Sequence, residues 1–252
     1  SWLAGEKIRK DIERAFLFRH ERLRRDLLRH QKHITDRPFK IAVTGSSGLI
    51  GKALRAFLST AGHEIICLVR SQKKLDGKTV YWKPSEGKLD PGALEGVDAV
   101  IHLAGENIAS GRWSEKKKQR ILSSRTEGTR LLAETLAALQ SQPKVFISAS
   151  AVGYYGGESA PVRDDSSAPG DNFLAKVCQA WEEAATPARD SGIRVFHPRI
   201  GVVLSPRGGA LGARGVLRRG GACLRRRTRG GPAGAGRRRP AAGAERGEPA
   251  LP

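Results

Sequence analysis

The chain of 252 residues contains no methionine, only three cysteines, and no uncharged apolar run near the roughly 18 residues that a membrane span needs. No secretory signal precedes the first expected strand. Cys67, Cys178 and Cys223 have neither metal-site nor redox-motif spacing, which predicts buried free thiols in a reducing compartment and no metal. We therefore expect a cytoplasmic protein that does not bind membranes. Because Ser1 is the first residue and methionine is absent, we also expect a fragment.

Acidic residues and lysine are scarce at the end of the chain, where positive charge is concentrated. The formal net charge is +20, and residues 211–252 hold eleven Arg, no Lys, two Glu and ten Gly. No apolar periodicity there could bury a core, so we expect residues 212–252 to be disordered. An Arg-rich, Lys-free composition is what GC-rich coding DNA yields out of frame, and we interpret the stretch as a frameshift product. The alternative is a genuine basic tail that binds nucleic acid through its phosphates.

A glycine-rich segment follows the first apolar run. Ile41–Val43 leads into Gly45-x-x-Gly48-x-x-Gly51, and apolar residues with helical spacing come next. In the order strand, turn, helix, Gly45 allows a tight turn, Gly48 admits a pyrophosphate, and Gly51 lets the helix lie close on the sheet. An ordinary turn between a strand and a helix is the alternative. We predict nucleotide binding, with these residues at the cofactor: Gly45, Ser47, Gly48, Leu49, Ile50 and Gly51.

Expected strands alternate with expected helices along residues 38–211. The strands are expected near 39–43, 64–69, 79–82, 97–102, 144–148 and 193–197, and the helices near 49–58, 115–136 and 172–185. Ser114 is expected to cap the second helix. The alternation predicts an α/β fold with a doubly wound parallel sheet, the Rossmann fold. Residues 1–37 are expected to form a helix and a linker, which we interpret as the end of an upstream domain.

The end of the second expected strand indicates which dinucleotide binds. At this position an acidic residue accepts from the 2′-hydroxyl of NAD, whereas Arg accommodates the 2′-phosphate of NADP. Here Arg70 and Ser71 are followed by Lys73 and Lys74, and the next acid is Asp76. We therefore predict NADP rather than NAD, with Arg70 at the phosphate. A solvated Arg70 at the rim of the sheet is the alternative.

Residues 39–211 resemble the extended short-chain dehydrogenase/reductase superfamily, also called the NAD-dependent epimerase/dehydratases, and within it the branch labelled epimerase family protein. The matching motifs are Thr44–Gly51, Gly62–Glu64, Leu103–Ile108, Arg112-Trp113, Ser124-Arg125, Ser148–Gly156, Trp181-Glu182 and Arg199–Leu204. Residues 18–27 resemble the end of a helix-grip ligand-binding domain that precedes this module in some members. In the family, a last strand and a small substrate domain follow residue 211, and a frameshift near Gly212 explains their absence here.

The resemblance implies catalysis by a Tyr, a Lys four residues later and a Ser or Thr, often with an Asn. Lys176 matches the Lys and Arg125 matches the Asn, but Asn172 stands at the position of the Tyr. An amide cannot shuttle a proton as a phenol does, so the standard mechanism needs a phenol from elsewhere.

Tyr155 or Tyr154, in the loop after the fifth strand, can provide this phenol. Ser148 and Ser150 are both candidates for the hydroxyl, and we prefer Ser150. We thus predict Ser150, Tyr155 and Lys176 as catalytic residues. The alternatives are tyrosines that only pack against the sheet rim and a Lys176 that is a plain surface residue.

The segment after the fourth long strand is expected near the cofactor. Leu103, Ala104 and Gly105 are small or apolar enough to admit it, whereas His102 inside the strand is interpreted as a structural imidazole. Two functions stay open. The first is an NADP-dependent, epimerase/dehydratase-like oxidoreductase acting on a small molecule, and the second is a dinucleotide-binding module without turnover. Nucleic-acid binding by the tail ranks last.

Overall fold

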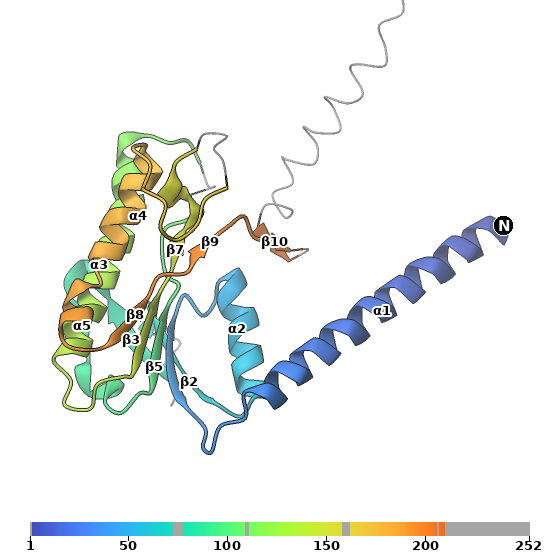
Figure 1. Ribbon diagram of the computed structural model, residues 1–252, viewed down its shortest axis with the longest axis horizontal. Coiled ribbons are helices and arrows are strands. Elements are labelled where there is room, and N and C mark those ends of the chain that lie inside the picture. Colours follow the sequence, from blue (N-terminus) through green and yellow to red (C-terminus); the bar gives the residue numbers. More distant parts are fainter. Residues whose placement is uncertain (1, 73–77, 109–110, 158–161, 206, 210–252) are drawn as a thin grey trace, which may run out of the picture. The chain divides into compact units, whose positions relative to one another are not determined.

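The computed structural model describes residues 2–72, 78–108, 111–157, 162–205 and 207–209, and in these residues the predicted doubly wound sheet is confirmed (Figure 1). The seven-stranded sheet has the order β4-β3-β2-β1-β5-β6-β8, and its pairings are parallel except β3 with β4. Its strands are β1 (Lys40–Thr44), β2 (Glu64–Val69), β3 (Thr79–Lys83), β4 (Lys88–Leu89), β5 (Ala99–His102), β6 (Val145–Ser148) and β8 (Arg194–Phe196).

The strand order reverses beside β1. From β1 the chain passes to β2 and β3 on one side, then returns to β5, β6 and β8 on the other. In open parallel sheets the crevice at the carboxyl ends of the strands beside such a reversal is where ligands bind. The carboxyl ends of β1 and β5 therefore position the candidate site.

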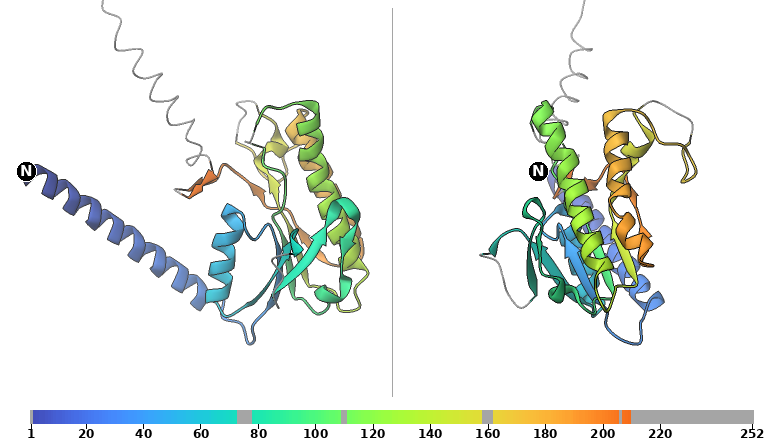
Figure 2. Two further views of the ribbon diagram at one scale, coloured as in Figure 1. Left: turned by 180° about the vertical axis from the view of Figure 1, so that it is seen from behind. Right: turned by 90° about the vertical axis from the view of Figure 1, so that its left-hand side faces the viewer.

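Helices cover both faces of the sheet. They are α2 (Leu49–Thr60), α3 (Glu115–Ala137), α4 (Phe173–Glu183) and α5 (Thr186–Asp190). On one face Val43, Ile65 and Ile101 pack with Leu54 and Leu58 of α2. On the other face a second buried cluster joins strand residues to α3 and α5: Ala42, Ile66, Val100, Phe146, Leu132, Leu136 and Ala188. Figure 2 shows α3 and α4 side by side on that face.

The alternation of strand side chains explains the two clusters. Ala42 and Val43 are adjacent in β1 and face opposite sides, as the two-residue period of a strand requires. Both are fully buried, so β1 lies inside a two-sided core. This burial matches the near-continuous apolar sequence of a parallel strand.

Short 3-10 segments replace some expected loops and strand ends. Asp90, expected in a loop, caps η3 (Pro91–Leu94), and its carboxylate accepts from the Gly92 N–H at 3.0 Å. Val97 donates its N–H to Leu94 O, so β5 begins at Ala99 rather than at residue 97. Ser114 caps α3 as predicted, since its Oγ accepts from the Lys117 N–H at 3.3 Å.

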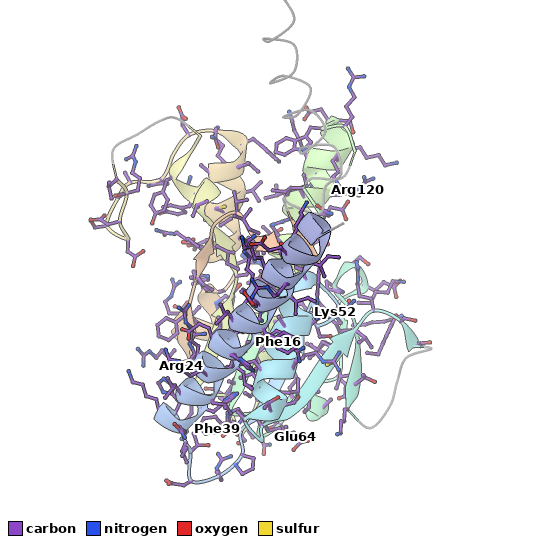
Figure 3. All side chains as sticks on the ribbon, turned by 90° about the vertical axis from the view of Figure 1, so that its right-hand side faces the viewer. Phe16, Arg24, Phe39, Lys52, Glu64 and Arg120 are labelled. Carbon is purple, nitrogen blue, oxygen red and sulfur yellow. The ribbon has the colours of Figure 1, made fainter. Side chains whose placement is uncertain are left out.

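The predicted N-terminal helix is α1 (Trp2–Lys32). Its apolar residues are largely exposed, with Ile8 at 59%, Phe16 at 52% and Leu23 at 57%. Figure 3 labels Phe16 on this helix together with Arg24. An amphipathic helix normally buries such a stripe, and within the described residues this one is not covered.

The chain divides into two units, residues 1–203 and 204–252. The first also holds the two-stranded parallel sheet of β7 (Ser150–Ala151) and β9 (Arg199–Ile200), and two further 3-10 segments, η2 (Pro84–Glu86) and η4 (Val152–Tyr155). In the second, β10 (Leu204–Ser205) forms antiparallel bridges with Gly208 and Gly209. The disorder and frameshift predicted for residues 212–252 lie outside the described residues. The domain boundaries at 37 and 211 stay predictions.

The described cysteines agree with the sequence analysis, since Cys67 and Cys178 are buried and free. Where the structure describes the chain, no cluster of three or more His, Cys, Asp or Glu side chains could hold a metal ion. In the same residues, every helix is too short or too polar to cross a bilayer.

Candidate dinucleotide-binding site

Gly45 brings the ends of β1 and β5 into direct backbone contact. Its φ is +66°, a left-handed conformation that glycine adopts without cost. A Cβ at this position would lie 2.8 Å from the carbonyl carbon and oxygen of Leu103 and 2.9 Å from the Ala104 nitrogen. No other residue type fits here without moving the segment after β5, which is predicted to lie near the cofactor.

Gly51 lies against the turn that follows β1. A Cβ on Gly51 would lie 2.2 Å from the Gly45 oxygen and 2.8 Å from the Ser46 Cα. The glycine therefore permits α2 to pack closely on the turn at the end of β1, in keeping with the predicted close approach of this helix to the sheet. The turn itself is closed by the Gly48 N–H, which donates to the Gly45 oxygen at 2.9 Å.

Among the described residues, no side chain forms a cap hydrogen bond at the N-terminus of α2. Gly48 is the N-cap in an extended conformation, no side chain caps the helix, and no acidic residue occupies the first turn. The first N–H groups of a helix have no acceptor within the helix. They are therefore oriented to bind an anion, with the dipole adding to the attraction. Contacts of Ser47, Leu49 and Ile50 with a cofactor stay predictions.

Thr44 links the two strand ends by one hydroxyl. Its Oγ1 accepts from the Leu103 N–H at 3.1 Å and the Ala104 N–H at 3.2 Å, and it lies 2.6 Å from His102 Nδ1. Because both amides only donate, the Thr44 hydroxyl proton is directed to Nδ1, and His102 is the Nε2–H tautomer. Burial, followed by the charge of Arg125, lowers the pKa of His102 to about 3. The imidazole is neutral and structural, in agreement with the prediction.

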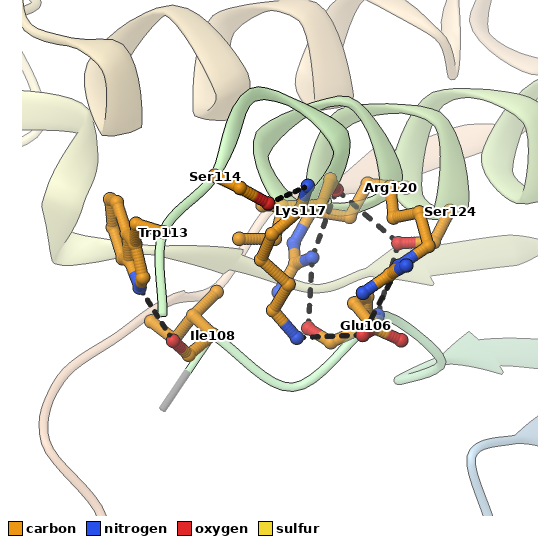
Figure 4. A network of polar contacts seen from close by, with 9 residues as sticks. Glu106, Ile108, Trp113, Ser114, Lys117, Arg120 and Ser124 are labelled. Atoms are coloured by element: carbon orange, nitrogen blue, oxygen red, sulfur yellow. Dashed lines mark hydrogen bonds and ion pairs between the residues drawn. The ribbon is translucent and has the colours of Figure 1, made fainter. Parts of the chain in front are cut away.

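Three successive turns of α3 hold Glu106, which follows the predicted cofactor segment (Figure 4). Lys117 Nζ donates to the carboxylate oxygen Oε1 of Glu106 at 2.7 Å. Ser124 Oγ accepts from the Glu106 N–H at 3.0 Å, and Arg125 Nη1 donates to the main-chain carbonyl oxygen of Glu106 at 3.2 Å. The Lys117 side chain is only 5% exposed, whereas the Glu106 side chain is 34% exposed, so only the lysine end of this ion pair is shielded from water. The hydrogen bond from Lys117 lowers the pKa of Glu106, with charges of Lys117, Arg120 and Arg70 adding to it.

Gly105 is small for a reason that the sequence did not show. A Cβ there would lie 3.3 Å from Cζ of Arg125. The half-buried Arg125 guanidinium also donates to Ile121 O at 3.0 Å and lies 5.0 Å from the Trp181 ring centroid. Leu103, Ala104 and Gly105 are thus held between Thr44 and α3, as a rigid wall opposite the glycine loop. In the sequence, Arg125 stands out only through its match to the family's Asn.

Arg70 lies directly after β2, exposed, where the sequence analysis expected it. Its charge contributes to the lowered pKa of Glu106, which follows the predicted cofactor segment. Lys73 and Lys74 lie outside the described residues. Recognition of a 2′-phosphate by Arg70 stays a prediction.

Of the three predicted catalytic residues, Ser150 and Tyr155 belong to one hydrogen-bonded group and Lys176 does not. Ser150 Oγ, buried, donates to Glu182 Oε1 at 2.6 Å, and Tyr155 OH accepts from Arg199 Nη1 at 2.7 Å. Arg199 joins the two, because its Nε and Nη2 each donate to Glu182 at 3.0 Å. Lys176 is exposed on α4 and forms no hydrogen bond or ion pair with Ser150 or Tyr155 within the described residues.

Asn172, at the position of the family's Tyr, caps α4. Its side chain accepts from the Ala175 N–H at 2.9 Å. An amide oxygen suits this capping role, which explains locally why a helix begins here. The second Ser candidate, Ser148, is buried with its Oγ unpaired among the described residues. The phenol that the sequence analysis sought therefore has its polar contact with Arg199 and not with Lys176.

Glu182 and Arg199 form a mostly buried ion pair that the sequence analysis quoted only as parts of motifs. Their side chains are 15% and 18% exposed. Burial raises the pKa of Glu182, but hydrogen bonds from Arg199 and Ser150 lower it by more. The pKa of Glu182 therefore lies below its usual value. The hydrogen bond to Glu182 raises the pKa of Arg199. Burial lowers the pKa of the neighbouring His197, against the attraction of Glu182.

A doubly wound sheet with a glycine turn and an uncapped helix at its reversal point defines a Rossmann-like dinucleotide-binding domain. The chain belongs to the NAD dependent epimerase/dehydratase family, whose model matches residues 41–224. The family resemblance found in the sequence is confirmed, and the match runs past the predicted domain end at residue 211.

Within this family, the chain is similar to the proteins named epimerase family protein. Epimerase family protein Mb2239 of Mycobacterium bovis is 45% identical over 171 residues, which is 68% of this chain and 56% of that protein. The nucleoside-diphosphate sugar epimerase of Corynebacterium glutamicum is 37% identical with a TM-score of 0.68, over 87% of this chain and 44% of that one. Human epimerase family protein SDR39U1 (isoform 2), solved with NADPH, is 33% identical with a TM-score of 0.62, over 73% of this chain and 60% of that one. The chain spans about half the length of the curated relatives it matches.

Proposed function

We propose that this chain binds NADP(H) and supplies the dinucleotide-binding part of an oxidoreductase acting on a small carbonyl- or hydroxyl-bearing molecule. The observation that carries the proposal is the uncapped N-terminus of α2, which Gly51 allows to pack on the turn after β1, where Gly45 contacts the segment after β5. A pyrophosphate is the anion that this arrangement suits. The human relative solved with NADPH supports the same cofactor.

The described residues fit the cofactor in three places. The first amides of α2 bind the pyrophosphate, Arg70 at the end of β2 binds the 2′-phosphate, and the Leu103–Gly105 segment forms the opposite wall. Bound NADPH supplies hydride to a carbonyl carbon. The substrate binds beyond β6, where the β7–β9 sheet and η4 lie.

Fluorescence titration with NADPH and with NADH tests the proposal. Replacing Arg70 by Ala should weaken NADPH binding about tenfold, the loss of roughly one charge-assisted hydrogen bond, and leave NADH binding unchanged. Arg55→Ala is the matched control, because Arg55 is an exposed Arg on α2 and removing it changes net charge equally. Wild-type protein that binds neither nucleotide would refute the proposal, and equal losses in the two variants would refute the role of Arg70.

A dinucleotide-binding module without turnover is the second candidate. It is favoured by Asn172, which caps a helix where the family has a catalytic Tyr, and by the exposed Lys176. NADPH oxidation measured with a panel of carbonyl compounds distinguishes the two, since only the enzyme consumes cofactor. The cytoplasmic location and the fused upstream helix-grip domain also stay proposals.

A further inference from the structure

The small β7–β9 sheet brings together residues that are far apart in the sequence. Its parallel register pairs Ser150 with Arg199. Both side chains reach Glu182 on α4, which packs against β7 and η4. The same guanidinium then reaches Tyr155 at the end of η4. This cluster of Ser150, Tyr155, Glu182 and Arg199 is hereafter the Arg199 cluster.

The hydrogen bond between Arg199 and Tyr155 has a defined direction. A guanidinium carries only donors, so the phenolic oxygen of Tyr155 accepts the Nη1–H at 2.7 Å. The phenol's own proton takes no part in that bond. Among the described residues, no acceptor takes it. Tyr155 therefore presents an O–H that is free to donate to another molecule.

The donor geometry is rigid because Arg199 is held on three sides. Its Nε and Nη2 form a two-pronged contact with the carboxylate of Glu182, an arrangement that fixes a guanidinium in plane. Its Cζ lies 3.5 Å from the ring centroid of Tyr154. Ser150 donates to the same carboxylate and so helps to orient it. In this arrangement Ser150 acts through Glu182, and its hydroxyl proton is not free for a substrate.

Resting on the proposed function, we propose that Arg199 is the positioning residue that fixes the Tyr155 hydroxyl as proton donor to a substrate carbonyl oxygen. Lys176 has no such contact, whereas Arg199 is within hydrogen-bonding distance of the only phenol oxygen in this cluster. The Arg–Tyr pair thus takes the place of the Tyr–Lys pair expected from the family, with the cation contributed by a strand and not by a helix.

The proposed step is the reduction of a carbonyl group to an alcohol, which takes one hydride and one proton. The carbonyl carbon gains a hydride from bound NADPH while the Tyr155 O–H bond breaks and its proton goes to the carbonyl oxygen. The products are an alcohol, NADP⁺ and a phenolate that keeps the charge-assisted hydrogen bond from Arg199. A proton from water then restores Tyr155. Because Glu182 offsets much of the Arg199 charge, the contribution of Arg199 is orientation of the phenol.

A double-mutant cycle tests this inference on the full chain. NADPH oxidation is followed with an aromatic aldehyde, an aliphatic ketone and an ortho-quinone. Tyr155→Phe should lower kcat about 100-fold, the usual effect of losing a general acid. Arg199→Lys keeps the charge for Glu182 but loses the fork, and should lower kcat about tenfold with the Kd for NADPH unchanged. Adding R199K to Y155F should cause no further loss, because Arg199 acts only through Tyr155.

Arg194→Lys is the matched control for Arg199→Lys. Arg194→Lys changes an exposed Arg that stacks on Phe196 in β8, and should leave kcat as in the wild type. Circular dichroism and the NADPH titration establish that each variant folds and binds. Wild-type rates in Arg199→Lys, or a tenfold loss on top of Tyr155→Phe, would overturn the inference. Wild type that binds NADPH but reduces none of the carbonyls would also overturn it while leaving the cofactor proposal intact.

Discussion

Replacing Gly51 by Ala should destabilise the protein, although Ala is the better helix former. In an ordinary helix interior this change stabilises by about 1 kcal/mol. Here the new Cβ would lie 2.2 Å from the Gly45 oxygen, 2.8 Å from the Ser46 Cα and 2.9 Å from the Gly45 carbonyl carbon. These distances are far inside the ~3.5 Å at which non-bonded atoms attract one another.

The expected change in the free energy of unfolding depends on which atoms must move to admit the new Cβ. All three atoms belong to the backbone of the turn, so no flexible side chain can give way. Overpacking at a rigid site costs about 3 kcal/mol, at the upper end of the usual range. After the gain in helix propensity, the net loss of unfolding free energy should be about 2 kcal/mol. Displacement of the Gly45 turn should also weaken NADPH binding about tenfold or more.

Gly128→Ala is the matched control, since Gly128 is also a helical glycine, in α3. Its Cβ would meet side-chain atoms of Trp82 at 3.4 Å and His102 at 3.5 Å, which are ordinary contacts. This variant should gain about 0.5–1 kcal/mol. Urea unfolding followed by circular dichroism gives both values. A Gly51→Ala protein as stable as the wild type, or a Gly128→Ala loss of equal size, would refute the steric argument.

Three further outcomes are expected, each measured by urea unfolding. Thr44→Val leaves the Leu103 and Ala104 amides and His102 Nδ1 without a partner, which should cost about 3 kcal/mol in total; a loss below 1 kcal/mol would contradict the network. Because the pKa of His102 falls from 6.5 to about 3 on folding, only the unfolded chain gains this proton below pH 6.5, and stability should decline as pH drops toward 3. His102→Gln should reduce that decline, by up to about 1.4 kcal/mol per pH unit, and an unchanged slope would exclude His102 as its source. Ser114→Ala removes the cap of α3 and should cost about 1 kcal/mol, whereas no change would mean that solvent replaces the cap.

Local sequence patterns were enough for most of the fold. The expected strand at 64–69 matches β2 residue for residue, and Ser114 caps α3, because apolar periodicity and capping are properties of neighbouring residues. The expected loop at Asp90 contains a 3-10 turn, and the expected strand at 97 starts two residues later. Such boundaries depend on single backbone hydrogen bonds, here from the Val97 N–H to Leu94 O, which apolar periodicity does not predict.

The sequence likewise predicted some features of the candidate site and not others. The glycine spacing and Arg70 after β2 could be recognised in the sequence, since each belongs to one strand–turn–helix or strand-end pattern. That Gly51 meets Gly45 and Ser46 could not be predicted, because this contact arises from a turn folding back on its own helix.

By itself the sequence determined the alternating elements, the glycine turn and the family, because these are recorded in residues that lie near one another along the chain. Only the tertiary structure decided which cation meets Tyr155. Lys176 has the expected spacing but is exposed on its helix, whereas Arg199 is 44 residues from Tyr155 and is brought to it by the pairing of β7 with β9. Contacts of that kind depend on strand register and helix packing, which no local pattern encodes.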